Sequence, residues 1–413
     1  MIVKAKNKSV EIENGIIVGV ESAPTSSLRV SDSERGNPKK NKVDCHENPA
    51  DFLAMTDCIL APQFIDLNVF PKNKSLSRNS ILSLGKKAKS GGVGILTLNS
   101  ATNPAIDNEM AMEFVKNISS EVAILPLIAS NVSDTNAESK GDSKICDITI
   151  LNALGGVGIN LDSAKGANTI DKVAKYAKML DIPLFVNAND NLGGMINYGA
   201  LSAELGIPAR SPLSEIKEVA KMLEVAIFYG IKVVFSAISE IRSLELINQA
   251  KKHNPQIFAE VSAHHLILSD EACKDYNTSA KINPPLKDAK GRDKLLESLQ
   301  NGDIDILTSL QCAHFNSKKE LPFGNAEYGI DAISHYFALL YSHLVDSKII
   351  SLERLFALCA ENPAKILGLN CGAIKKGKEA KLMAVDLDSS VSVDDAFSPY
   401  NGANLKGKVL RFV

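Results

Sequence analysis

The sequence predicts an α/β protein, in which a (β/α)8 TIM barrel is joined to a small β-sandwich domain built from the N- and C-terminal segments. Two observations carry this prediction. From residue 59 onward, short apolar runs rich in β-branched residues alternate with helical patterns, which is typical of a parallel sheet buried on both faces. The first and last segments contain strand patterns without intervening helices. Eight strand-and-helix units over about 250 residues match the size of a closed barrel.

The expected barrel strands share a short apolar run that ends in a polar turn. They are residues 59–70, 92–100, 122–130, 155–162, 182–189, 231–239, 257–268 and 304–310. Helical periodicity between them predicts helices, for example over 80–89, 170–179 and 212–229. An open, doubly wound sheet is the alternative arrangement for the same alternation of elements.

The two ends of the chain predict the smaller domain. Residues 1–20 alternate apolar and polar side chains around Asn14-Gly15, a pattern that predicts a β-hairpin. The stretch that follows is rich in Ser, Asn, Pro and charge, and we expect most of it to be loop. The expected domains are 1–58 (with 21–58 partly loop) and 371–413 for the small β domain, and 59–370 for the barrel.

Composition limits the classes of partner. The net charge of −2 and the pI of about 6.4 give no basic face for nucleic acid. The N-terminal stretch lacks the apolar region of a signal peptide, and no apolar run approaches the roughly 18 residues of a membrane span. The seven cysteines include no C-x-x-C pair and are expected to be reduced thiols. We therefore expect a cytoplasmic protein that binds neither nucleic acid nor membrane.

The expected strand ends are poor in metal ligands. In a TIM barrel the active site forms at the carboxyl ends of the strands. The residues there are Asn68, Phe70, Asn99, Ala101, Asn160, Asp162, Asn187, Asn189, Ala237, Ser239, His264, His265 and Ser309. Zinc prefers imidazole, thiolate or carboxylate ligands. No histidine occurs between residues 47 and 252, so the first six strands cannot supply a multi-histidine site.

Few other reactive or ligand-binding side chains are expected near the carboxyl ends of the barrel strands. His264 and His265 are expected on a strand, where neighbours point to opposite faces and cannot chelate one ion together. His314, in the loop after the eighth strand, could face the mouth or be a plain loop residue. Cys312 could pair with His314 as a catalytic dyad, although both lie in one loop. Asn283 precedes two prolines that fix its backbone and aim its side chain.

Common cofactor and nucleophile motifs are absent from the sequence. The stretches GGVGI and LGGMINYG lack a P-loop lysine and a spaced dinucleotide fingerprint, and there is no G-x-S-x-G elbow. Asp66 lies inside the first expected barrel strand. We expect it to support that strand from below the mouth and not to react.

Over nearly its whole length the chain resembles the dihydroorotases of the amidohydrolase superfamily, of the kind that assembles with aspartate carbamoyltransferase. The matching stretches are ILAPQFIDLNVF, AKSGGVGILTLNSATNPAID, GGMINYGALSAELGIPARSPLSE, AEVSAHHLILSDEACKDYNTSAKINPPLK, LLESLQNGDIDILTS, AEYGI and ENPAKILGL. Their order and spacing carry the resemblance. It implies an amidohydrolase barrel that uses zinc-bound hydroxide to open or close a cyclic amide.

The resemblance also implies which positions would carry the chemistry. The family's metal ligands and catalytic aspartate correspond here to Asn68, Phe70, Leu161 or Asp162, Asn187, Ala237 and Ser309. Among the substrate contacts, an arginine corresponds to Lys72 and an asparagine to Ala101. Asn283, His314 and Gly329 retain the residue types of the family.

By this resemblance, the motifs that shape the fold are kept, while the residues at the metal-binding and catalytic positions are replaced. A metal lowers the pKa of water from 15.7 to about 7, and a positioned base contributes roughly 10²–10⁴ in rate. We therefore expect no zinc and no catalysis. The expected role is that of a dihydroorotase-like structural or regulatory subunit for aspartate carbamoyltransferase in pyrimidine synthesis, within a hetero- or homo-oligomer.

Two alternatives stand beside this expectation. The first is an active dihydroorotase, or another cyclic-amide hydrolase, with atypical ligands. The second is a binding module that senses a small acid through Lys72, Asn283 and His314.

Overall fold

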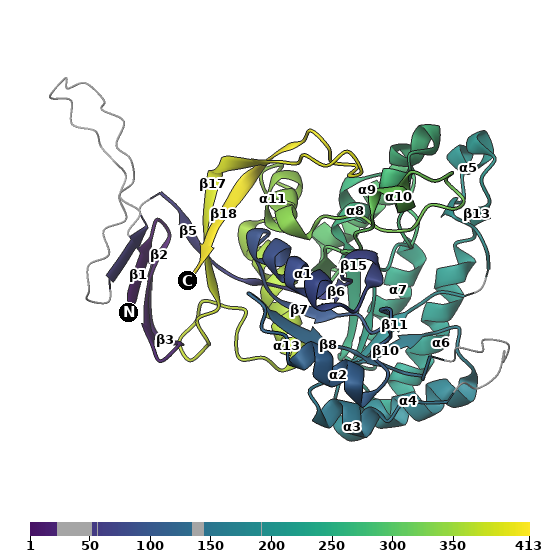
Figure 1. Cartoon of the computed structure of the whole chain (residues 1–413), viewed down its shortest axis with the longest axis horizontal. Coiled ribbons are helices and arrows are strands. Elements are labelled where there is room, and N and C mark those ends of the chain that lie inside the picture. The colour runs from purple at the N-terminus through teal and green to yellow at the C-terminus, as the bar shows by residue number, and fades with distance from the viewer. Residues whose placement is uncertain (23–51, 56, 134–143, 191) are drawn as a thin grey trace.

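The structure is a computed structural model that describes residues 1–22, 52–55, 57–133, 144–190 and 192–413. Figure 1 shows a strand barrel wrapped by helices and, beside it, a smaller β unit that holds both chain ends. The predicted fold class, a TIM barrel with a small β domain, is confirmed. Within the described residues, no helix has the length and apolarity needed to cross a membrane.

Parallel strands form the barrel. They are β6 (Phe64–Val69), β7 (Val93–Leu98), β8 (Ala123–Pro126) with β9 (Ile128–Ala129), β10 (Ile159–Asp162), β11 (Leu184–Asn187), β14 (Val233–Phe235), β15 (Ile257–Ser262) and β16 (Ile306–Thr308). β8 pairs with β7 and β9 pairs with β10, so these two pieces together act as the third strand. The circle closes where the Phe70 N–H donates to the Gln311 carbonyl (2.8 Å). The sheet is therefore closed and not an open doubly wound sheet.

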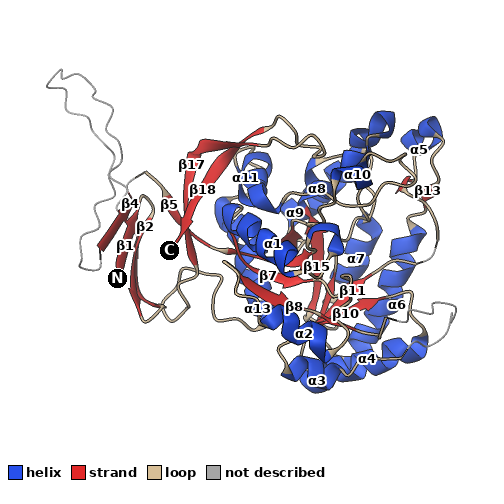
Figure 2. Cartoon of the chain, in the orientation of Figure 1, coloured by secondary structure: helices blue, strands red, loops and turns tan. Residues whose placement is uncertain are grey.

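Helices cover the outside of the barrel (Figure 2). They include α1 (Arg78–Ser90), α2 (Glu109–Lys116), α3 (Ile148–Ala153), α4 (Ala167–Leu180), α5 (Ala200–Leu205), α6 (Leu213–Tyr229), α7 (Ile241–Ala250), α9 (Ala289–Asn301), α10 (Asn316–Lys319), α11 (Tyr336–Leu340), α12 (Leu352–Phe356) and α13 (Asn362–Leu367). Side-chain caps fix several starts: Asn108 accepts from the Ala111 N–H, and Asp288 accepts from the Gly291 N–H. The three helices named from the sequence are confirmed.

Two sheets form the small domain. One contains β1 (Ile2–Ala5), β2 (Lys8–Glu13), β3 (Ile16–Ser22) and β4 (Phe52–Met55), and the other contains β5 (Ile59–Pro62), β17 (Leu382–Ser392) and β18 (Asn404–Phe412). Val10 and Ile17 of the first sheet share one buried cluster with Leu60 and Leu382 of the second. Asn14 and Gly15 have φ values of 49° and 77°, as the tight turn of the predicted hairpin requires.

The first expected barrel strand, 59–70, is in fact two strands. β5 pairs antiparallel with β17 in the small domain, and only β6 belongs to the barrel. Between them the Gln63 side chain donates to the Leu382 carbonyl (2.9 Å) and holds the chain against the small sheet. The domain boundary placed at residue 59 therefore lies after β5. The loop expected over 21–58 falls mostly outside the described residues, and its described part includes β4.

The seventh expected strand, 257–268, is also shorter than predicted. β15 ends at Ser262, and His264 and His265 lie in the short helix α8 (Ala263–Ile267). The Ser262 side chain caps this helix by accepting from the His265 N–H (3.3 Å). The apolar run resembled a continued strand, but the serine starts a helical turn instead.

Candidate functional site

A cavity of about 270 Å³ opens at the carboxyl ends of the barrel strands, where a TIM barrel carries its active site. We call it the mouth cavity. It is lined by Asn68, Phe70, Lys74, Asn99, Ala101, Asn160, Asp162, Asn187, Ser236, Ala237, Ile282, Asn283, Pro284, Leu310, Cys312, Glu327, Tyr328 and Gly329. Amides dominate its polar lining, with one lysine, two carboxylates and one phenol.

Three of these amides and one buried carboxyl group form a chain of hydrogen bonds across four strands. The Asn160 Nδ2 donates to Asn99 Oδ1 (2.9 Å), and the Asn99 Nδ2 to Asn68 Oδ1 (3.4 Å). The Asn68 Nδ2 then donates to Glu260 Oε1 (3.2 Å), which also accepts from the Ala237 N–H (3.2 Å). We call Asn160, Asn99, Asn68 and Glu260 the amide chain. It joins β10, β7, β6 and β15.

The end of the amide chain is an acid held away from water. Glu260 is fully buried on β15, and desolvation, followed by the nearby charge of Asp66, raises its pKa to about 8. Asp66 is also fully buried, and desolvation raises its pKa. It accepts from the Thr308 hydroxyl (2.6 Å) and the Ser309 N–H (3.1 Å). Asp66 thus braces β6 against β16, as predicted, and Glu260 is mainly protonated at neutral pH.

Most positions that the resemblance assigns to metal chemistry face the mouth cavity. Asn68, Phe70, Asp162, Asn187 and Ala237 line it. Ser309 does not line it, because its side chain is fully buried beside Asp66.

Of the two residues proposed at the end of β10, one faces the cavity. Asp162 lines the mouth cavity, whereas Leu161 is fully buried in the core. The Asp162 carboxylate accepts from the Ala164 N–H (3.0 Å). It is accessible to solvent, yet the protein around it raises its pKa, mainly through desolvation.

These residues do not fit zinc. At the positions of the family's ligands, the side chains are amides, a phenyl ring, a methyl group and a hydroxyl, and only Asp162 offers a donor that zinc prefers. Across the part of the chain that the structure describes, no group of three or more His, Cys, Asp or Glu side chains could hold a metal ion. The amides at the strand ends bond to one another instead.

The predicted substrate contacts divide into two pairs. Asn283 and Gly329 line the mouth cavity, whereas Lys72 and His314 do not. Lys72 is exposed, with its Nζ 4.8 Å from the centre of the Phe315 ring. The expectation that Lys72 faces the mouth is therefore wrong.

Lys74 takes the place expected of Lys72. It lines the cavity, and its Nζ lies 5.1 Å from the centre of the Phe70 ring. The backbone explains the exchange, since Asn73 and Lys74 have φ values of 55° and 54°. Two successive left-handed residues turn the chain sharply and bring the second lysine to the cavity.

Cys312 and His314 touch without forming a catalytic dyad. Their Sγ and Nε2 atoms are 3.4 Å apart, and the same Nε2 lies 3.0 Å from the Tyr328 carbonyl. Burial raises the pKa of Cys312 to about 11 and lowers that of His314. The thiol therefore stays protonated at neutral pH, and the neighbouring imidazole is a weak base.

His264 and His265 are buried and hydrogen-bonded. His264 Nδ1 lies 2.8 Å from the Tyr400 hydroxyl, and His265 Nε2 lies 3.1 Å from the Pro284 carbonyl. Desolvation lowers their pKa values to about 3 and about 4. Both are neutral and bonded within the fold, and they lie on a helix and not on the expected strand.

Two buried lysines hold the wall of the cavity that follows β16. The Lys281 Nζ donates to the carbonyls of Phe323 (2.5 Å) and Ala326 (2.6 Å). The Lys319 Nζ donates to the carbonyls of Thr278 (3.0 Å) and Glu327 (3.0 Å), and desolvation lowers its pKa to about 8. We call Lys281 and Lys319 the lysine clamp. It fixes the loop that brings Glu327, Tyr328 and Gly329 to the cavity.

Gly329 is required where this loop meets the strand ends. Its φ is 139°, and a Cβ atom there would lie 2.1 Å from the Cys312 carbonyl oxygen. Only glycine fits this close approach.

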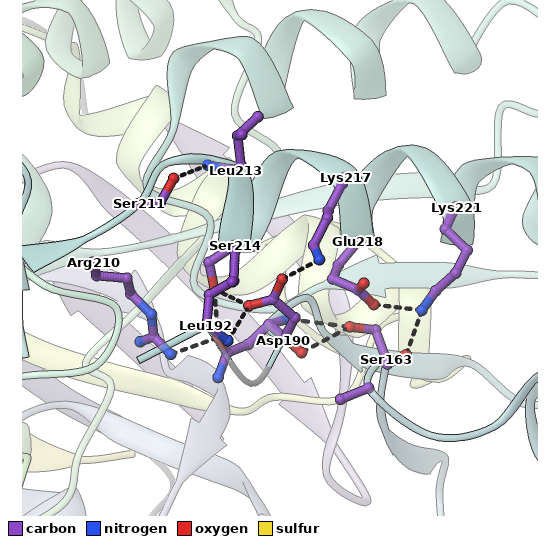
Figure 3. A network of polar contacts seen from close by, with 12 residues as sticks. Ser163, Asp190, Leu192, Arg210, Ser211, Leu213, Ser214, Lys217, Glu218 and Lys221 are labelled. Carbon is purple, nitrogen blue, oxygen red and sulfur yellow. Dashed lines mark hydrogen bonds and ion pairs between the residues drawn. The ribbon is translucent and has the colours of Figure 1, made fainter. Parts of the chain in front are cut away.

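A polar network follows β11, next to Asn187 and Asn283 of the mouth cavity (Figure 3). Asp190 accepts from the Ser214 hydroxyl (2.8 Å) and pairs with Lys217 (2.5 Å) at the start of α6. Arg210 donates to the Asn189 side chain (2.5 Å) and also to Asn283 Oδ1. Arg210 thereby fixes the Asn283 amide at the rim, in agreement with the aimed side chain that the sequence predicted.

Sequence reasoning missed Lys74, Arg210, Glu260 and the lysine clamp. Glu260 carried a usable signal, because it is a lone acid inside the apolar run IFAEVSA. Such a residue in a buried strand needs a partner. The two clamp lysines lie in polar loops, where the sequence gives no sign of burial.

Comparisons with known proteins identify the family. The family described as "Amidohydrolase family" matches residues 155–411. A dihydroorotase from Thermoanaerobacter sp. (strain X514) is 28% identical over 412 residues, which cover 96% of this chain and 94% of that protein. A probable dihydroorotase-like protein from Helicobacter pylori (strain J99) is 30% identical over 389 residues, which cover 94% of this chain and 90% of that protein.

Solved structures show the same fold. An L-hydantoinase (dihydropyrimidinase) from Arthrobacter aurescens has a TM-score of 0.79 at 18% identity, covering 100% of this chain and 94% of that one. A D-hydantoinase (dihydropyrimidinase) from Thermus sp. has a TM-score of 0.77 at 16% identity, covering 100% and 93%. At these identities the likeness concerns the fold alone.

Proposed function

The chain belongs to the dihydroorotase family of the amidohydrolase superfamily, and from this premise we propose that it is catalytically inactive. Its role in this proposal is that of a cytoplasmic structural or regulatory subunit for aspartate carbamoyltransferase in de novo pyrimidine biosynthesis. The observation that supports the inactive part is the bonding of Asn68, which stands where the resemblance implies a metal ligand and is tied to Asn99 and Glu260 in the amide chain. The partner rests on the resemblance of the sequence.

The remaining acids and thiols give no substitute for a metal-bound hydroxide. A metal lowers the pKa of water by roughly eight units, which corresponds to about eight decades of hydroxide at neutral pH. Asp66 and Glu260 are fully buried and cannot reach a substrate. The Cys312 thiol is protonated. Asp162 and Glu327 line the cavity, but a carboxylate acting as a general base adds only roughly 10²–10⁴ in rate.

The experiment for the partner is co-purification. The tagged full-length chain, isolated from its native lysate at low salt, is expected to elute together with aspartate carbamoyltransferase. The transferase should lose activity or thermal stability when the chain is deleted. Elution of the tagged chain alone, with a fully active and stable transferase in its absence, would refute this role.

The experiment for inactivity is a turnover assay in both directions of the family reaction. We expect no conversion of dihydroorotate or carbamoyl aspartate above background, with or without added zinc. A dihydroorotase such as that of Thermoanaerobacter serves as the positive control in the same buffer. Turnover that chelator abolishes would instead favour an active hydrolase with atypical ligands.

A further inference from the structure

The mouth cavity contains unpaired charges of both signs. Asp162 accepts only a backbone N–H, and the Glu327 side chain has no hydrogen bond or ion pair within the described residues. Lys74 lies near the Phe70 ring and has no carboxylate partner among those residues. One ammonium and two carboxylates therefore line the same small space. Among the groups that line the cavity, a ligand with two negative charges would meet two carboxylates and one ammonium. Lys281 and Lys319 also interact with Glu327, but their ammoniums are engaged by backbone carbonyls.

Uncharged polar groups complete the lining. Within the described part of the chain, the Asn187 side chain and the Tyr328 hydroxyl make no hydrogen bond, although both face the cavity. The Asn283 oxygen is held by Arg210, which leaves its Nδ2 free to donate. These amides can bind the polar end of a ligand through both donors and acceptors.

The size of the cavity limits the ligand. Its volume of about 270 Å³ lies below the roughly 300–1,000 Å³ of sites for drug-sized molecules, so a small metabolite fits it best.

Resting on the proposed loss of catalysis, we propose that the mouth cavity binds a small zwitterion of the α-amino-acid class that carries a terminal carboxamide. The ligand's ammonium contacts Asp162 or Glu327, and its carboxylate contacts Lys74. Its carboxamide contacts Asn187 and Asn283. The site thus prefers a ligand without net charge and discriminates against dicarboxylates. This would give the subunit a binding event that requires no metal.

The test compares three ligands built on one four-carbon skeleton by isothermal titration calorimetry. They are L-asparagine, with no net charge, L-aspartate, with one net negative charge, and N-carbamoyl-L-aspartate, with two negative charges and no ammonium. We expect affinity to fall in this order, by at least about tenfold from first to last. Equal or tighter binding of N-carbamoyl-L-aspartate overturns the proposal, as does the absence of binding by all three at millimolar concentration.

Variants show whether the binding occurs in the cavity. Replacing both carboxylates, Asp162→Asn with Glu327→Gln, should weaken L-asparagine binding roughly tenfold or more at an unchanged melting temperature. Glu320→Gln is the matched control, because Glu320 is exposed on the same loop outside the cavity, and it should bind like the wild type. If the double variant binds L-asparagine as tightly as the wild type, the ligand does not bind in the mouth cavity and the proposal is wrong. Co-purification with the transferase is a separate experiment. A negative result in the ligand-binding test therefore does not decide whether the chain is a subunit of the transferase.

Discussion

The two walls of the mouth cavity differ in what their polar groups contact. On β6, on β10 and directly after β7, the amides Asn68, Asn160 and Asn99 form a hydrogen-bonded chain that ends at Glu260. In the loops that follow β15 and β16, the lysine clamp holds backbone carbonyls. The first wall includes Asn68, where the resemblance implies a metal ligand, and its amides bond to neighbouring side chains. The second wall carries groups that fix the chain, and these are fully bonded.

This difference teaches that chemistry and architecture occupy separate residues in this barrel. A strand end keeps its place when its side chain changes from a ligand to an amide, provided the amide finds a partner. A clamp lysine has no such freedom, because its ammonium serves several buried carbonyls at once. The fold can therefore persist after the reactive groups are replaced.

The largest expected loss of stability comes from removing a lysine of the lysine clamp in the second wall. Lys281→Met removes an ammonium that donates to the Phe323 and Ala326 carbonyls, so those oxygens lose their partner. We expect a loss of about 3–5 kcal/mol in the free energy of unfolding, measured by urea denaturation. Lys72→Met is the matched control, and because Lys72 is exposed it should change stability by less than about 0.5 kcal/mol. Equal effects of the two variants would contradict the comparison.

The next effect concerns pH and the end of the amide chain. Between about pH 4.5 and pH 8 the unfolded chain ionises Glu260 while the folded protein keeps it protonated. Glu260 therefore makes stability fall as pH rises through this window, by on the order of a few kcal/mol in total. Below the window it has no effect, and above it the loss is constant. Glu260→Gln should remove this part of the slope.

Urea unfolding of the wild type and the Glu260→Gln variant at pH 5 and pH 8 checks this prediction. Asp66 has a raised pKa and contributes a slope of the same sign in both proteins, so the difference between them reports Glu260 together with its coupling to Asp66. Parallel stability profiles would show that Glu260 is ionised in the folded protein.

A smaller effect is expected from breaking the first wall. Asn99→Ala removes the middle of the amide chain, and we expect a loss of about 1 kcal/mol, because water at the cavity can replace part of the bonding. Asn187→Ala is the control from the neighbouring strand β11, since Asn187 also lines the cavity and makes no side-chain hydrogen bond within the described residues. The melting temperature of the Asn187→Ala variant should equal that of the wild type. A destabilisation as large as that of Lys281→Met would show that the two walls do not differ.

The smallest expected change in stability concerns the backbone of Ala237, directly after β14. Ala237 has a φ of 52°, a left-handed conformation that costs a residue with a Cβ about 1–2 kcal/mol. Glycine adopts it freely but loses about 0.5–1 kcal/mol in chain entropy. Ala237→Gly is therefore expected to stabilise the protein by about 0.5 kcal/mol, visible as a small rise in melting temperature. Ala188→Gly, at a residue without positive φ, should destabilise it instead.

The sequence was informative wherever a local pattern decides the outcome. The Asn14-Gly15 turn, the eight apolar runs and the missing histidines could all be read from residue types and spacing. The mouth positions followed because strand ends meet at one edge of a barrel.

What the sequence could not supply depends on contacts between distant segments. β5 joins β17, far along the chain, and not the barrel strand that follows it. Lys74, and not Lys72, lines the cavity because Asn73 and Lys74 both adopt a left-handed backbone conformation. The amino-acid composition of this stretch does not predict that conformation. Glu260 meets Asn68 only when the barrel closes.

Metal content tests the central claim most directly. The full-length chain would be purified without chelator, incubated with excess zinc, dialysed, and analysed by inductively coupled plasma mass spectrometry. The donor-poor mouth cavity predicts far less than one zinc ion per chain. One or two zinc ions retained per chain, and lost when Asp162 and Asn187 are replaced, would contradict the account.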